Sequence, residues 1–213
     1  MRTDELITLL ASAATPVRPN GARRRFQTAL LLGGAAALFL MQVGYGVRND
    51  LAQALAVPMF WLKFAFPLGI LIPALVLTFR VAHPGARLGR AWMLLPLPWL
   101  VVATIAVLVM ANHPQAVWLP LVLGRTWVSC VFNIALIAAP VLAAVLCAVK
   151  GLAPTQPVLA GACAGLASGA AGALVYALHC TEMQAPFLAI WYLLGMLMPA
   201  GVGALLGQKL LRW

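Results

Sequence analysis

The hydrophobic residues of this chain form long unbroken runs rather than alternating patterns. Six runs cover residues 26–45, 58–79, 91–111, 126–148, 157–177 and 186–206. Each has about 20 residues, enough for an α-helix to cross a hydrocarbon core of roughly 30 Å. Backbone polar groups must be paired inside lipid, and no run shows the alternation of a strand. The sequence therefore predicts an all-α fold, an integral membrane bundle of six transmembrane helices.

The positively charged residues between the runs predict the orientation of the bundle. On one side of the predicted membrane the sequence places eleven of them: Arg2, Arg18, Arg23, Arg24, Arg25, Arg80, Arg87, Arg90, Lys150, Lys209 and Arg212. On the other side it places Arg48, Lys63 and Arg125. Lys and Arg concentrate in cytoplasmic loops, so both termini are expected in the cytoplasm. Lys63, near the outer end of its run, is expected to extend its amino group to the membrane surface.

The residues before the first run predict a separate cytoplasmic tail, residues 1–25, ahead of a six-span domain, residues 26–213. Thr3 can cap a short helix whose first turn carries Asp4 and Glu5, the charge favoured at a helix N-terminus. Pro16 would end it. One face of this helix is apolar: Leu6, Leu9, Leu10 and Ala13 fall on it, with Ile7 beside them.

A helix of about 10 residues is marginally stable alone in water, so this one needs a surface to bind. It could rest on the membrane or on the protein's own loops. Helices that lie on membranes usually carry Lys or Arg on their polar face, however, and this one carries acids. The sequence therefore favours a protein partner for the tail helix.

The composition excludes several classes of function. The chain has 213 residues, of which 64% are hydrophobic and 8% charged, and its net charge is +10. Membrane topology accounts for the positive charge, so no direct nucleic-acid binding is expected. None of the acidic residues lies within a run, and no catalytic or phosphate-binding motif is present. We therefore expect neither an enzyme nor an obligatory cofactor, and we identify no signal peptide.

Two of the four cysteines form the main chemical candidate. Cys130 and Cys180 are predicted near the outer face, whereas Cys147 and Cys163 fit small apolar positions in helix packing. His179 and Glu182 flank Cys180. Together these side chains could hold a transient soft metal ion such as zinc or cadmium, with Cys130, Cys180, His179 and Glu182 as ligands. The two thiols could instead form a disulfide, as a switch or as a permanent link, or could be unrelated.

Small residues recur every four positions in the last two runs. Gly161, Gly165 and Gly169 lie in the fifth run, and Gly203 and Gly207 lie in the sixth. Such spacing allows close contact between helices. Packing within one chain is the simpler interpretation, and a homo-oligomer formed through these helices is the alternative.

Several short segments, in order along nearly the whole chain, resemble the NrsF family of membrane-bound anti-sigma factors. The segments are Thr3-Asp4-Glu5-Leu6-Ile7, Pro84-Gly85, Trp127-x-x-Cys130, Tyr176-Ala177-Leu178-His179-Cys180, Trp191-Tyr192 and Leu211-Arg212-Trp213. The resemblance implies a protein of the bacterial inner membrane whose N-terminal segment binds an extracytoplasmic-function sigma factor and keeps it from RNA polymerase. By that analogy the partner-binding residues are Asp4, Glu5, Leu6, Ile7, Leu9 and Leu10. It also implies that Cys130 and Cys180 sense heavy metals or oxidants. Thr181 stands where the family pattern leads us to expect proline.

Two other functions fit a small membrane protein. A transporter or channel for a metal ion or apolar solute would need a polar path, and the runs offer mainly Asn133, Thr104 and Ser168. An assembly subunit of a membrane complex could use the glycine-rich helices as its docking face.

Overall fold

The computed structural model describes residues 3–13, 20–85 and 89–212, and this part of the chain contains helices and no strand. Six segments are long and apolar enough to cross a membrane. Their main helices are α2 (Gly21–Gly44), α4 (Pro58–Val81), α5 (Pro96–Ala111), α7 (Trp127–Lys150), α8 (Pro157–Tyr176) and α10 (Leu193–Leu210). The prediction of an all-α fold is confirmed for the described residues, and six helices have the length and apolarity that the predicted spans require. The second, third and fifth of these helices start with a proline at their first position, where its missing N–H costs nothing.

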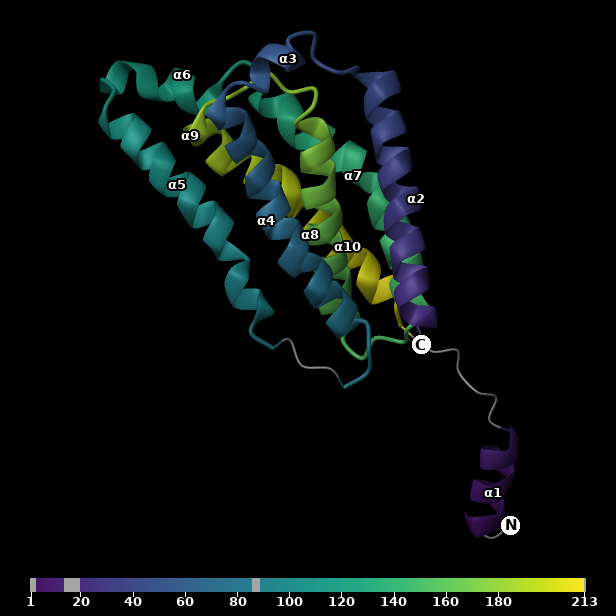
Figure 1. Cartoon of the computed structure of the whole chain (residues 1–213). Helices are drawn as coiled ribbons and strands as arrows, with labels where there is room; N and C mark the ends of the chain where they lie inside the picture. The colour runs from purple at the N-terminus through teal and green to yellow at the C-terminus, as the bar shows by residue number, and fades with distance from the viewer. Residues whose placement is uncertain (1–2, 14–19, 86–88, 213) are drawn as a thin grey trace.

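Short elements gather at one end of the bundle, which we call the upper end because it is uppermost in Figure 1. They are α3 (Leu51–Ala54), α6 (Trp118–Leu123) and α9 (Ala185–Phe187), with a 3₁₀ turn, η2 (Gln115–Val117), before α6. The start of α2 and the C-terminal end of the chain lie together at the opposite, lower end. An even number of spans returns the chain to the end where it began. The cytoplasmic location of the lower end stays a prediction.

The basic residues divide between the two ends as the sequence predicted. Alternating helices bring to the lower end Arg23, Arg24, Arg25, Arg80, Arg90, Lys150, Lys209 and Arg212. The upper end receives Arg48, Lys63 and Arg125. The remaining basic residues of the count, Arg2, Arg18 and Arg87, lie outside the described residues, as do Pro16 and Trp213.

Helix α8 lies at the centre of the bundle and packs against α10, α7 and α4. Its closest neighbour is α10, because glycines face each other across the contact. A Cβ added at Gly161 would collide with the backbone of Gly203, and one added at Gly165 would collide with the carbonyl of Pro199. The glycine spacing therefore serves packing within one chain, as the simpler interpretation predicted. Homo-oligomer formation stays a prediction, although these glycine faces are already occupied.

The third and sixth spans are not uniform α-helices. The third begins with a 3₁₀ turn, η1 (Ala91–Leu94), and the sixth contains a π-helical turn, η3 (Leu188–Tyr192), between α9 and α10. A π-turn disturbs the regular helical hydrogen-bond ladder. The indole N–H of Trp99 on α5 donates to the Ala189 carbonyl at 3.0 Å. This bond ties α5, which buries little of its own surface, to the sixth span.

The N-terminal residues form a helix, α1 (Thr3–Ala13), that lies apart from the bundle in Figure 1. Its side chains are exposed on every face, including the apolar face. Asp4 and Glu5 occupy its first turn, where negative charge stabilises a helix. The cytoplasmic location of α1 and its role in binding stay predictions.

Candidate functional site

Both candidate cysteines are buried at the upper end of the bundle. Cys130 lies in the first turn of α7 and is 0% exposed, and Cys180 lies in the loop after α8 and is 3% exposed. The loop begins with a tight turn in which the amides of His179 and Cys180 both donate to the Tyr176 carbonyl. Both cysteines are free thiols.

Lys63 lies near the upper end of α4 and contacts the Cys180 loop, so its side chain does not extend out of the bundle as the sequence suggested. The side chain is completely buried. Its amino group donates to the main-chain carbonyls of Cys180 at 2.6 Å and Glu182 at 2.9 Å. The same nitrogen lies 5.4 Å from the centroid of the Tyr192 ring. Two carbonyls and a ring face replace the water that the amino group would otherwise reach, and the Cys180 loop is thereby fixed to α4.

Arg48 holds the same loop from the side of α2. Its amide donates to the Leu178 carbonyl at 3.1 Å, and its guanidinium donates to the Cys180 carbonyl at 3.3 Å. The guanidinium also makes two hydrogen bonds to the Asp50 carboxylate, at 2.7 and 2.6 Å. These bonds lower the pKa of Asp50 and raise the pKa of Arg48, because they favour the charged form of both groups.

His179 and Glu182, the other predicted metal ligands, contact backbone groups. The Nδ1 atom of His179 lies 2.9 Å from the Gly46 carbonyl oxygen. The Glu182 carboxylate accepts a hydrogen bond from the Arg125 amide at 2.8 Å, just before α7 begins. Gly124 has a positive φ of 55°, and a side chain there would collide with this carboxylate. Glu182 therefore places negative charge at the N-terminal end of α7, where the helix dipole favours it.

The four predicted metal ligands do not converge on one point. Among the described residues, no group of three or more His, Cys, Asp or Glu side chains is arranged to hold a metal ion. The structure buries both thiols at the upper end and places the imidazole and the carboxylate against backbone groups of other segments. Metal binding and disulfide formation at Cys130 and Cys180 both stay predictions.

Sequence analysis missed several polar residues around the thiols. The Tyr45 hydroxyl donates to Asn133 at 2.8 Å, and the Asn133 amide reaches the Tyr176 hydroxyl at 3.5 Å. These bonds link Tyr45, the residue that follows α2, to α7 and α8. The Tyr192 hydroxyl is buried and, within the part of the chain that the structure describes, has no hydrogen-bond partner. The sequence had singled out Asn133 as one of the few polar residues within the runs, and Tyr176 and Tyr192 only as parts of the segments that resemble the family.

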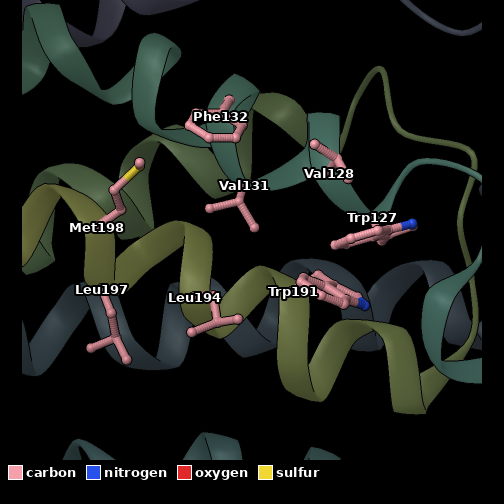
Figure 2. Close-up of a pocket in the computed structure, with 8 residues that line it drawn as sticks. All are labelled: Trp127, Val128, Val131, Phe132, Trp191, Leu194, Leu197 and Met198. Atoms are coloured by element: carbon pink, nitrogen blue, oxygen red, sulfur yellow. The ribbon is translucent and has the colours of Figure 1, made fainter.

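An apolar groove of about 470 Å³ runs along α7 and α10. Figure 2 shows its eight lining side chains, which are Trp127, Val128, Val131, Phe132, Trp191, Leu194, Leu197 and Met198. The two tryptophan rings lie side by side, with centroids 4.9 Å apart. No charged side chain lines this groove, so it matches a surface in contact with lipid rather than an ion path.

The second set of candidates, on α1, is separate from the cysteines. The apolar side chains Leu6, Ile7, Leu9 and Leu10 are all exposed, and Leu10 is 64% exposed. On the polar face, the Thr8 hydroxyl donates to the Asp4 carbonyl and the Ser12 hydroxyl to the Leu9 carbonyl. These bonds stay within the helix, and the apolar face has no described contact with the bundle.

Known proteins resemble the chain over its whole length. Residues 10–213 match the model of the NrsF family, described as negative regulator of sigma F. A curated protein of Azospira oryzae named "Probable anti-sigma-F factor NrsF" is 45% identical over 213 residues, covering all of both chains. The "Anti-sigma-F factor NrsF" of Caulobacter vibrioides is 37% identical over 214 residues, again covering all of both chains. No solved structure matches.

Proposed function

The chain belongs to the NrsF family of negative regulators of sigma F, which are anti-sigma factors and not enzymes, and we propose that it is an inner-membrane protein that binds an extracytoplasmic-function sigma factor through its N-terminal segment. In this proposal the lower end of the bundle faces the cytoplasm. The upper end, with Cys130 and Cys180, faces the periplasm. Stress at the upper end releases the sigma factor from the tail. The family assignment favours this function over a transporter or an assembly subunit.

The exposed apolar face of α1 is the observation that carries the binding proposal. Leu6, Leu9 and Leu10 lie on this face and remain uncovered. Apolar side chains on a short exposed helix gain free energy when they enter a groove of another protein. Asp4 and Glu5 add negative charge at one end of the helix, which a basic groove would complement.

A pull-down tests the binding proposal. The sigma factor would come from the same genome, and the bait would be full-length protein in detergent. We expect a variant lacking residues 1–20, and the point variants Leu6→Ser and Leu10→Ser, to retain less sigma factor. Ser12→Ala is the matched control, because its hydroxyl bonds only within α1 in the described structure. Equal retention by the truncated and full-length proteins would overturn the proposed role of α1.

The sensing part of the proposal rests on the position of the two thiols. Lys63, on α4, and Arg48, in the loop after α2, both donate to the Cys180 carbonyl, while Cys130 lies at the start of α7. A metal ion or a disulfide that changes the distance between the two sulfur atoms would therefore strain contacts with several helices. An effector shifts the equilibrium between two arrangements only by its differential affinity for them. The proposal therefore requires a second arrangement of the bundle in which α1 binds its partner less tightly.

A further inference from the structure

A groove of about 540 Å³ runs between α2 and α4 at the lower end of the bundle. These two helices make their main contacts elsewhere, α2 with α7 and α4 with α8. The side chains of Phe26 and Phe79 meet between them, with ring centroids 5.8 Å apart, and Leu75 and Val76 complete the apolar part of the lining. Because Val76 is exposed, the groove opens sideways, toward the lipid that surrounds a membrane-spanning bundle.

The mouth of this groove, at the lower end, is basic. Arg23, Gln27 and Arg80 line it, and all three residues are exposed. The guanidinium of Arg80 lies against Gly89, where an added Cβ would collide with it. Gly89 also has a positive φ of 66°, which disfavours other residues there. Arg80 and Leu75 lie about 7.5 Å apart along α4, so the groove passes from a charged mouth to an apolar interior within two helical turns.

The sequence places no acidic residue at the lower end of the bundle. Of the four acids in the chain, Asp4 and Glu5 belong to α1, and Asp50 and Glu182 lie at the upper end. Helix α2 begins at Gly21 without a side-chain cap and with no acid in its first turn. Its N-terminal amides therefore add positive charge at the same end as the basic mouth. The anion that complements this charge has to come from outside the bundle.

We propose that this groove binds an anionic phospholipid such as phosphatidylglycerol, with the phosphate at Arg23 and Arg80 and an acyl chain along the apolar walls. Guanidinium groups form paired, charge-assisted hydrogen bonds with phosphate oxygens. Basic pockets between membrane helices bind such headgroups. A soluble anion would make no use of the apolar walls, and a soluble protein would not enter the hydrocarbon region. No sigma factor takes part, so this inference is independent of the proposed function.

Native mass spectrometry of the full-length protein in detergent tests the proposal. Phosphatidylglycerol and phosphatidylcholine with the same acyl chains are compared, so the ratio of their affinities for the first bound lipid isolates the effect of headgroup charge. One basic residue near an anionic headgroup contributes about fivefold in affinity. We expect the wild type to prefer phosphatidylglycerol, and Arg23→Gln/Arg80→Gln to lose about tenfold or more of this preference. Arg24→Gln/Lys209→Gln is the charge-matched control, because these two residues lie at the lower end outside the groove lining.

A second variant, Val76→Trp, tests the apolar part of the groove. Val76 is exposed, so the larger ring fills the groove without entering the core and leaves both guanidinium groups in place. We expect the affinity for both lipids to fall about fourfold or more, which corresponds to one or more acyl methylene groups losing their contact.

Three results would overturn the proposal. They are a wild type without headgroup preference, an equal loss of preference in the groove variant and the charge-matched control, and an unchanged lipid affinity in Val76→Trp. A preference that appears only in Asp4→Asn/Glu5→Gln would also overturn it, because the acidic helix α1 would then be the occupant of the groove.

Discussion

At the scale of single residues, the polar side chains at the upper end mainly pair the backbone groups of loops. Lys63 and Arg48 satisfy carbonyls of the loop that carries Cys180, and Glu182 satisfies an amide ahead of α7. Unpaired backbone groups near lipid are costly, so the few polar residues of an apolar chain are used at such places. A change at Cys180 would therefore act on the residues that fix three helix ends.

Asn133 should contribute measurably to stability, because it joins tyrosines of two other helices. We expect Asn133→Leu to lower the free energy of unfolding by about 1 kcal/mol, the usual scale of hydrogen bonds between membrane helices. Thermal unfolding in detergent measures this. Thr104→Val is the control, since the Thr104 hydroxyl bonds its own helix on an exposed face. An equal loss of unfolding free energy in Asn133→Leu and Thr104→Val would contradict a specific role for Asn133.

The ion pair between Arg48 and Asp50 should make the upper loops dependent on pH. The pKa of Asp50 is lower in the folded protein, so the pair stabilises the fold above the unfolded pKa of about 4 and is lost as pH falls through the folded value. Hydrogen exchange at the Arg48 amide reports this, because that amide donates to Leu178. We expect Asp50→Asn to lower its protection near neutral pH and to abolish the acid-dependent change. Identical protection in the two proteins would contradict this account.

At the scale of elements, the contact between α8 and α10 depends on glycines rather than on large side chains. Without a hydrophobic driving force inside lipid, close backbone approach provides the dispersion energy that holds the two helices together. The glycines of one helix face those of the other, and backbone atoms fill the space where side chains would be.

One methyl group should be enough to disrupt this contact. We expect Gly165→Ala to destabilise the protein by about 1–3 kcal/mol, the cost of overpacking a tight core. Gly34→Ala in α2 is the matched control, because a Cβ added there would meet no other atom within 4 Å. That variant should be neutral or more stable by up to about 1 kcal/mol, since alanine favours helix. Thermal unfolding in detergent measures both changes in stability. An equal loss of stability in Gly165→Ala and Gly34→Ala would be inconsistent with the observed packing.

The sequence predicts the spans well and the site only in part. Lipid requires unbroken apolar helices, so the six spans can be read directly from the chain. The burial of Lys63 could not be predicted from the sequence, because the carbonyls that accept its hydrogen bonds lie 117 and 119 residues away along the chain. The contact of Glu182 with Arg125 likewise crosses 57 residues. Such contacts depend on the tertiary arrangement, and local patterns do not encode them. The sequence did place both cysteines at the same end.

At the scale of the whole molecule, the two ends of the bundle differ in charge and content. The lower end holds most of the described basic residues, the start of α2 and the C-terminal end of the chain, and the upper end holds Cys130, Cys180 and the short helices. The proposed function needs these ends in different compartments, with α1 beside the sigma factor and the thiols outside the cytoplasm.

Reporter fusions test this orientation. Alkaline phosphatase is active only outside the cytoplasm, so we expect a fusion after His113, at the upper end, to be active. A fusion after Gly151, at the lower end, should be inactive. The reverse result would place α1 and the sigma factor on opposite sides of the membrane and exclude the proposed mechanism.

The most direct test of the central claim is release of bound sigma factor when cadmium is added to the complex in membranes. The account predicts that cadmium weakens binding at least about fivefold in the wild-type protein, at the low end of typical coupling between sites. The Cys147→Ser control, at the lower end of the bundle, should respond in the same way. The double variant Cys130→Ser/Cys180→Ser should keep its sigma factor. Equal release from the double variant and the wild type would contradict the claim that these two thiols are the sensor.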